Sequence, residues 1–174
     1  MYNDIILASQ SPRRAEILSS LNVPFRVIPS HFDEDSISYN GNPGEYVCRL
    51  AEYKAQTVAA MHPEAIVISA DTVVFLENVP YGKPPSREEA ERYLSDLCGR
   101  WHSVFTGVSV MCGDTHRQAA EETKVFFNDL SSEQIKAYLN AIQWQDKSGA
   151  YAIQGNGGAL LVSQISGCFY NVMG

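Results

Sequence analysis

One apolar stretch, from Ala65 to Leu76, limits the possible folds more than any other segment of the chain. It is the longest apolar run, and polar residues interrupt it at Ser69, Asp71 and Thr72. Such a short, interrupted run cannot cross a membrane as a helix. Its β-branched residues favour strands instead. The sequence therefore predicts a strand at 66–68, a functional corner at 69–72 and a second strand at 73–76.

Strand-like and helix-like segments alternate along the rest of the chain. Helix start signals stand at Ser11-Pro12, Asn42-Pro43, Ser86-x-x-Glu89 and Ser131-x-x-Gln134. The apolar face of the first helix is expected to contain Ala15, Ile17, Leu18 and Leu21. The other helices are expected to reach about Met61, Cys98 and Ile142. Further strands are expected at 5–8, 25–28, 101–111, 123–127, 160–162 and 169–172, and loops at 31–42, 80–85 and 113–122. This alternation predicts an α/β protein with a mixed sheet.

The composition favours one domain over 1–174. The chain has 174 residues and 45% of them are apolar, which is enough to bury a core. Its 13 basic and 20 acidic residues give a net charge of -7, which argues against a track for a nucleic acid polymer. An anionic ligand must therefore be bound by a local cluster of cations.

The cysteines and the N-terminal residues indicate a cytoplasmic protein with no membrane partner. The four cysteines are scattered and form no C-x-x-C pair, which favours reduced thiols over a zinc ribbon or a disulfide scaffold. Residues 1–8 lack the cationic region and the long apolar region of a signal peptide.

The segment Ser9-Gln-Ser-Pro-Arg-Arg14 is the first candidate site. A strand that turns directly into a helix presents free backbone N–H groups and the positive end of the helix dipole, which together favour an anion. Arg13 and Arg14 add positive charge in the first turn, where the dipole alone favours acids. The alternative is a surface pair bound to Asp or Glu, since the segment lacks the glycines of a P-loop.

Two acids are candidates for catalysis or metal binding. Asp71 follows a buried strand, where an acid has no packing role, so its position predicts metal binding, water activation or both. The alternative is an Asx turn. Glu34 lies within Asp33-Glu-Asp35 and is either a metal ligand or part of an acidic loop.

Other polar residues lie at junctions between the expected elements. Lys54, Lys83 and Lys147 are each, taken alone, typical of a surface charge, although Lys83 lies on the constrained backbone of Gly-Lys-Pro. Gln154, before Gly155, can present both amide atoms to a planar ligand, the alternative being a surface glutamine at a strand end. The four histidines show neither metal spacing nor a triad with a serine.

Taken in order, these motifs resemble those of the Maf family of nucleoside triphosphate pyrophosphatases. The matching stretches cover nearly the whole chain: Leu7–Arg14, Arg49–Ala55, Ser69–Val74, Gly82–Pro84, His102–Val108, Asp146–Gly155 and Phe169–Val172.

The resemblance implies two lobes around a nucleotide cleft, as in inosine triphosphate pyrophosphatases, and cleavage of a nucleoside triphosphate between its α and β phosphates. It also implies a divalent cation such as Mg²⁺ or Mn²⁺. On the family pattern Asp71 accepts the proton from water, and Glu34 and Asp71 hold the metal. The residues expected to bind phosphate are Ser9, Arg14, Lys54, Lys83 and Lys147.

The resemblance also implies a pyrimidine substrate. The subgroup selective for dTTP and UTP is marked by Arg13, Thr72 and Gln154, all present in this chain. A sister subgroup that acts on 7-methyl-GTP carries Trp and Glu at the first and last of these positions. One Gln amide can match the N3–H and O4 of uracil or thymine, but a flipped amide also matches cytosine. We therefore hypothesise that Arg13, a fixed donor, rejects cytosine.

Two other functions stay open at this point. One is a house-cleaning pyrophosphatase for modified pyrimidine nucleotides. The other is a non-catalytic nucleotide-binding regulator of cell division, because the family name derives from septum inhibition.

The family forms dimers, so a homodimer is a possible assembly. Family members usually continue past the final Asn-Val-x-Gly with Leu-Pro-Leu and an amphipathic helix. This chain stops at Gly174, so we expect either that the sequence is truncated or that the protein lacks that helix.

Overall fold

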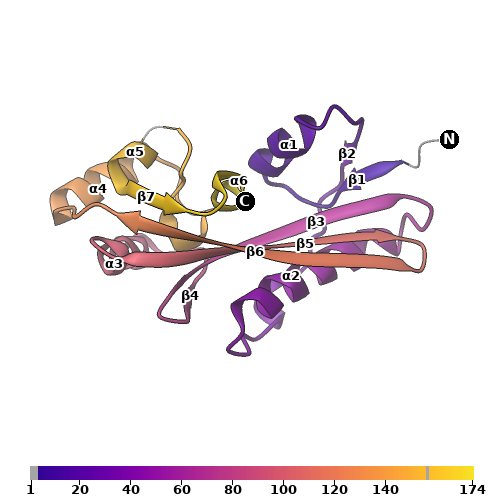
Figure 1. Ribbon diagram of the computed structural model, residues 1–174, viewed down its shortest axis with the longest axis horizontal. Helices are drawn as coiled ribbons and strands as arrows, with labels where there is room; N and C mark the ends of the chain where they lie inside the picture. The colour runs from indigo at the N-terminus through magenta and orange to yellow at the C-terminus, as the bar shows by residue number, and fades with distance from the viewer. Residues whose placement is uncertain (1–3, 156) are drawn as a thin grey trace. The chain divides into compact units, whose positions relative to one another are not determined.

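The computed structural model describes residues 4–155 and 157–174 and shows a mixed seven-stranded sheet (Figure 1). The strands follow the order β2-β1-β3-β5-β6-β7, and β4 pairs with β3. β1 is parallel to β2 and β3, whereas β4 and β7 are antiparallel to β3 and β6. The strands are β1 (Ile5–Leu7), β2 (Arg26–Val27), β3 (Ile66–Leu76), β4 (Val79–Tyr81), β5 (Trp101–Cys112), β6 (Thr115–Phe127) and β7 (Val162–Ser166). The predicted α/β class is confirmed.

Four helices begin at the four predicted signals, and two short helices near the C-terminus were not predicted. They are α1 (Pro12–Ser19), α2 (Pro43–Ala59), α3 (Arg87–Leu97), α4 (Ser132–Ala141), α5 (Gly158–Leu161) and α6 (Phe169–Met173), with 3-10 turns η1 (Glu34–Ser36) and η2 (Ser148–Ala150). The side chains of Asn42, Ser86 and Ser131 accept backbone N–H groups of the first turns of α2, α3 and α4. Within the described part of the chain, no helix is long and apolar enough to span a membrane.

The chain forms two compact units, and each has its own core. Unit 1 contains the described residues up to Asp71 together with Thr106–Glu121 and Gly174, and unit 2 contains Thr72–Phe105 and Glu122–Met173. The unit 1 core consists of Ile6, Ala8, Ala55, Val58, Ala65, Val67 and Met111. The larger unit 2 core includes Val74, Leu94, Leu97, Val104, Val125, Phe127, Tyr138 and Leu161.

In unit 1, α2 lies very close to the sheet. A Cβ atom added at Gly107 of β5 would lie 2.4 Å from the carbonyl carbon and oxygen of Val47. Only a residue without a side chain fits at that distance. The glycine therefore lets the helix backbone approach the strand, which brings the polar groups of α2 within reach of β3.

The predicted corner at 69–72 is wrong, because β3 is one continuous strand through this region. Two of the polar side chains that suggested a break find partners on α2 instead. Ser69 donates a hydrogen bond to the Ala51 carbonyl oxygen, and Asp71 pairs with Lys54. Since their polar groups are satisfied there, the strand continues through them.

Other segments predicted from polarity or Gly content also differ. The expected loop at 113–122 is mostly strand, since β6 begins at Thr115 and its exposed residues remain paired within the sheet. Part of the expected loop at 80–85 is strand β4, which follows a two-residue turn at Glu77-Asn78 with positive φ at both positions. The expected strands at 160–162 and 169–172 are largely the helices α5 and α6.

The face of α1 is also less buried than its sequence predicts. Of the four apolar residues expected there only Leu18 is buried, and Leu21 lies past the end of the helix with 66% of its surface exposed.

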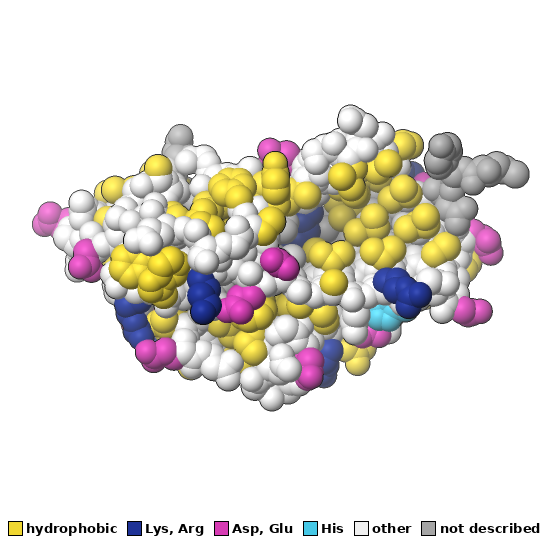
Figure 2. Space-filling view, viewed as in Figure 1, with side chains coloured by type: hydrophobic (Ala, Val, Ile, Leu, Met, Phe, Trp, Pro, Cys, Tyr) yellow, Lys and Arg dark blue, Asp and Glu magenta, His cyan; other side chains and the backbone are white. Residues whose placement is uncertain are grey.

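Charged side chains of both signs lie interspersed on the face of the molecule drawn in Figure 2.

The unit 2 core holds one buried histidine. The His102 ring contacts the rings of Phe127 and Tyr151 edge-on, and its Nε2 atom lies 3.0 Å from the Tyr151 hydroxyl oxygen. Burial lowers the pKa of His102 to about 4 and raises the pKa of Tyr151. His102 is therefore neutral in the folded protein over the whole physiological range.

This burial predicts a loss of stability in acid. Between pH 7 and 5.5 the unfolded chain protonates His102, whose unfolded pKa is about 6.5, while the folded protein does not. The free energy of unfolding should fall by about 1 kcal/mol from this group alone. Urea denaturation at both pH values should show a decline that is smaller by that amount in His102→Asn than in the wild type. Equal declines would contradict the assignment.

Candidate active site

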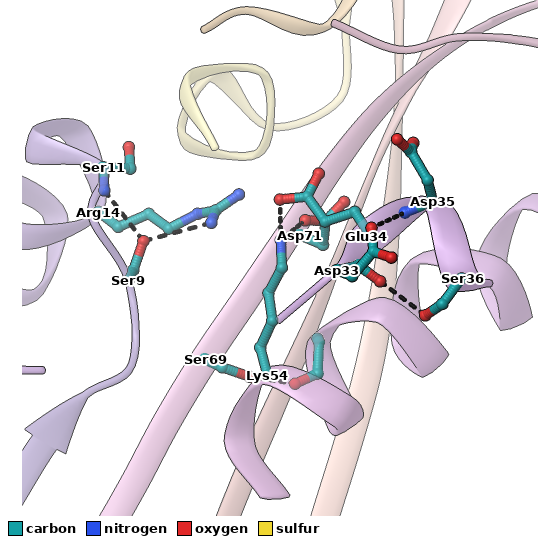
Figure 3. Close-up of polar contacts among 11 residues, drawn as sticks. Ser9, Ser11, Arg14, Asp33, Glu34, Asp35, Ser36, Lys54, Ser69 and Asp71 are labelled. Carbon is teal, nitrogen blue, oxygen red and sulfur yellow. Dashed lines mark hydrogen bonds and ion pairs between the residues drawn. The ribbon is translucent and has the colours of Figure 1, made fainter. Parts of the chain in front are cut away.

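The centre of the candidate site is a buried ion cluster in unit 1. Asp71, on β3, is 5% exposed and forms a short ion pair with Lys54 of α2. The Lys54 ammonium also lies 2.9 Å from a carboxylate oxygen of Glu34. Figure 3 shows the two carboxylates converging on this one nitrogen. Asp71, which was predicted to follow a strand, therefore lies within a strand.

The periodicities of strand and helix place these side chains together. Alternate residues of β3 face α2, so Val67, Ser69 and Asp71 share one face. Val67 shares a core with Ala55 and Val58, Ser69 bonds Ala51, and the helix therefore runs antiparallel to the strand. Helical side chains lean toward the helix N-terminus, and this lean carries the long stem of Lys54 past Ser69 to Asp71.

Glu34 reaches the cluster from a short ordered turn. The Asp33 side chain accepts the backbone N–H of Asp35 at 3.2 Å, and the Ser36 hydroxyl donates to the Asp33 carbonyl at 2.6 Å. These bonds close the turn η1 and hold its backbone. Part of the segment that was predicted as an acidic loop thus presents one carboxylate to Lys54.

Arg14 is the second cation of the cluster. Its guanidinium donates to the Ser9 hydroxyl at 3.3 Å, and the same hydroxyl accepts the Ser11 backbone N–H at 3.1 Å. Its Nε atom is buried and has no hydrogen-bond partner among the described residues. Burial lowers the pKa of Arg14, and the nearby charges of Asp71 and Glu34 oppose that effect. In Figure 3 the guanidinium points from α1 toward these carboxylates.

The donor set of the cluster suits a hard divalent cation. Glu34 and Asp71 supply carboxylate oxygens that meet at one point, now bridged by Lys54. Within residues 4–155 and 157–174, no group of three or more His, Cys, Asp or Glu side chains has metal-binding geometry. Two carboxylates alone match the way Mg²⁺ binds in phosphate-handling enzymes, where substrate phosphates and water complete the shell.

Arg13, in the first turn of α1, belongs to unit 1, and the other remaining predicted site residues belong to unit 2. Thr72 follows Asp71 in β3, and Gln154 is half-buried in the bend after η2. Lys83 and Lys147 lie on two loops joined by a hydrogen bond of 3.1 Å from the Gly149 N–H to the Gly82 carbonyl. Lys147 is turned onto its own loop, where it bonds the carbonyl of Gln143 and the carboxylate of Asp146.

The Gln154 bend is fixed by two buried tyrosines. The backbone N–H of Ala152 donates to the Tyr138 hydroxyl at 3.2 Å, and the Tyr151 hydroxyl contacts His102. Burial raises the pKa of Tyr138 to about 12, so its hydroxyl remains a neutral partner. The segment that leads to Gln154 therefore has little freedom.

A serine–histidine pair in unit 1 was not expected from the sequence. The Ser109 hydroxyl lies 3.0 Å from Nε2 of His116, whose Nδ1 is 3.9 Å from a Glu52 carboxylate oxygen. The order resembles a hydrolase triad, but the Ser109 side chain is completely buried. A substrate cannot reach it, so this serine is not a nucleophile.

The contact that Ser69 makes was likewise not expected from the sequence. The sequence places Ser69 in the Asp71 motif without giving it a partner, and the structure gives it the Ala51 carbonyl. The signal for this contact is a matched spacing. Ser69 and Asp71 are two apart on a strand, and Ala51 and Lys54 are three apart on a helix, so each pair lies on one face.

Comparison with known proteins decides the family. Residues 4–174 of this chain match the protein family that is described as "Maf-like protein". The chain belongs to the Maf family. A dTTP/UTP pyrophosphatase of Symbiobacterium thermophilum is 47% identical over 170 residues, which are 98% of this chain and 87% of that protein. Another from Bacillus velezensis is 45% identical over 174 residues, which are 100% of this chain and 91% of that protein.

A solved structure supports the fold of this Maf protein. The Ham1 protein of Staphylococcus aureus has a TM-score of 0.52 and 19% sequence identity, and the match covers 73% of each chain. This similarity shows a shared mixed α/β fold.

The ion cluster predicts a strong dependence of stability on Lys54. Lys54→Met removes the partner of a buried carboxylate and should lower the free energy of unfolding by about 3 kcal/mol. The control Lys124→Met changes an exposed lysine and should lie within about 0.5 kcal/mol of the wild type. Chemical denaturation at neutral pH measures both. Equal effects in the two variants would show that Lys54 does not compensate a buried charge.

Proposed function

We propose that this Maf protein is a nucleoside triphosphate pyrophosphatase that hydrolyses dTTP and UTP to the monophosphate and pyrophosphate. The observation that carries the proposal is the cluster in which Glu34 and Arg14, both partly buried, lie beside the buried ion pair of Asp71 and Lys54. Eight relatives between 41% and 47% identical over nearly the whole chain are named dTTP/UTP pyrophosphatase, which supports the substrate class.

Asp71 is the proton acceptor in this proposal. A water molecule attacks the α-phosphorus, and its proton passes to the Asp71 carboxylate as the new P–O bond forms. The bond from the α-phosphorus to the bridging oxygen breaks, and pyrophosphate leaves with the bond electrons. Lys54 and the rigid strand β3 fix the orientation of the carboxylate, so the base is positioned before the substrate arrives.

Glu34 and Asp71 would hold the divalent cation, for example Mg²⁺ or Mn²⁺. When bound, that ion offsets the charge that develops on the phosphate oxygens. For Glu34 and Asp71 both to reach a metal, the Lys54 ammonium would release Glu34 and keep its pair with Asp71, whose second oxygen remains for the metal. We propose that it then binds a phosphate oxygen.

The cations supply the rest of the phosphate binding. A nucleoside triphosphate carries roughly four negative charges, which charge-assisted hydrogen bonds can offset. The buried Nε atom of Arg14, which has no hydrogen-bond partner among the described residues, supports a role for this side chain in binding an anion. We assign phosphate binding to Ser9, Arg14, Lys54, Lys83 and Lys147, of which Lys147 must first leave Asp146.

Gln154, Thr72 and Arg13 are assigned to the pyrimidine base. The fixed backbone before Gln154 supports a defined amide position, which suits a planar ligand with adjacent donor and acceptor atoms. We assign the rejection of cytosine to Arg13. Comparing kcat/KM for UTP and for CTP in the wild type and in Arg13→Ala tests that assignment. An unchanged preference for UTP over CTP would exclude it.

The direct test is pyrophosphate release by the purified protein with Mg²⁺ or Mn²⁺. UTP and dTTP should be cleaved with higher kcat/KM than CTP or GTP. Asp71→Asn should lower kcat by at least about 100-fold, because a positioned base contributes on that order. Asp114→Asn, at an exposed turn, is the matched control and should keep wild-type activity.

Two outcomes would replace the proposal. Binding of UTP without any pyrophosphate release would favour a nucleotide-binding regulator. A much higher kcat/KM for modified pyrimidine triphosphates would favour a house-cleaning enzyme.

A further inference from the structure

We infer that Ser69 is a positioning residue that holds Lys54 against Asp71, an inference that rests on the proposed function. Ser69 is completely buried, and its hydroxyl donates a hydrogen bond to the Ala51 carbonyl oxygen at 2.5 Å. Ser69 lies two residues before Asp71 on β3, and Ala51 lies one helical turn before Lys54 on α2. The bond therefore joins the two backbones that carry the ion pair.

The Ala51 carbonyl oxygen does not need the hydrogen bond from Ser69 to be satisfied. Ala51 lies in the middle of α2, where its carbonyl already belongs to the helical hydrogen-bond pattern. Ser69 is fully buried, and a buried hydroxyl costs free energy unless it is paired. A smaller apolar residue would fill this core position without that cost. What the hydroxyl adds is a fixed link between helix and strand.

The neighbouring packing makes this link decisive for the ion pair. At Gly107 the α2 backbone approaches β5 so closely that no Cβ fits, which fixes the helix near Val47. Apolar packing fixes it near Ala55 and Val58. Apolar contacts are non-directional and allow a helix to slide, whereas a hydrogen bond fixes the register. Ser69 bonds the helix between these two packed regions, next to the base of the Lys54 stem.

Loss of the link should therefore affect catalysis more than binding. A shift on the order of 1 Å at a reacting centre can lower a rate by about 100-fold. Partial loosening of α2 is expected to lower kcat by about tenfold. Binding of a non-hydrolysable UTP analogue should change by less than about threefold, since several cations share the phosphates.

Two isosteric substitutions isolate the hydroxyl. Ser69→Thr and Ser69→Val have nearly the same shape, and only threonine can donate to the Ala51 carbonyl. We expect Ser69→Thr to have about tenfold higher kcat for UTP than Ser69→Val, with similar analogue binding. Ser69→Ala, which adds no bulk, should match the valine variant in kcat. Thermal melting must show each protein folded at the assay temperature.

Ser109 provides the matched control pair. It is equally buried on a strand of the same unit, and its hydroxyl bonds His116 rather than α2. Ser109→Thr and Ser109→Val should have kcat values within about twofold of each other. Equal kcat for the two Ser69 variants would overturn the inference. So would a threonine-to-valine difference at Ser109 as large as that at Ser69, because any buried hydroxyl would then have the effect.

A second readout does not depend on activity. The Lys54 side chain is almost fully buried in its ion pair, so it should react slowly with an amine-acylating reagent. Peptide mass spectrometry should show faster labelling of Lys54 in Ser69→Val than in Ser69→Thr. If the wild type releases no pyrophosphate from UTP, the proposed function fails while this labelling ratio still tests the positioning. Equal labelling would overturn the role of Ser69.

Discussion

The ammonium of Lys54, held between the carboxylates of Asp71 and Glu34, is the interaction on which unit 1 depends. An isolated charge inside a protein is strongly unfavourable, so Asp71 is tolerated in the middle of β3 only with a paired cation. Here the paired cation, Lys54, comes from α2, so α2 must lie close to the sheet. That requirement explains why Gly107 leaves no room for a side chain.

The same cluster joins the fold to the proposed chemistry. A base for water must be ionised, fixed and close to bound phosphate, and a strand packed under a helix provides that rigidity. Asp71 is the last residue of β3 assigned to unit 1, and Thr72 begins unit 2. The residues proposed for catalysis and for the pyrimidine base thus include neighbours on one strand. Arg14 and Glu34 come from other elements of unit 1 and complete the polar cluster.

Local signals in the sequence predicted local structure well. The starts of α3 and α4 were predicted from Ser86 and Ser131, because a cap bonds backbone only a few residues away. The corner at 69–72 and the loop at 113–122 were wrong, because polarity was interpreted as irregular structure. In the first case tertiary partners satisfy the polar groups, and in the second the exposed β6 keeps its sheet pairing. The set of site residues came from ordered family motifs, whereas the burial of the Arg14 Nε atom and the Ser69–Ala51 bond depend on contacts distant in sequence.

In the proposed mechanism, Asp71 directs water at the α-phosphorus of a pyrimidine nucleoside triphosphate. The most direct measurement is hydrolysis of UTP in water enriched in the heavy oxygen isotope, followed by mass spectrometry of both products. If this mechanism is right, the heavy oxygen appears in the phosphate of UMP and the pyrophosphate carries none. Heavy oxygen in pyrophosphate, or release of labelled orthophosphate, would show attack at another phosphorus and would contradict it.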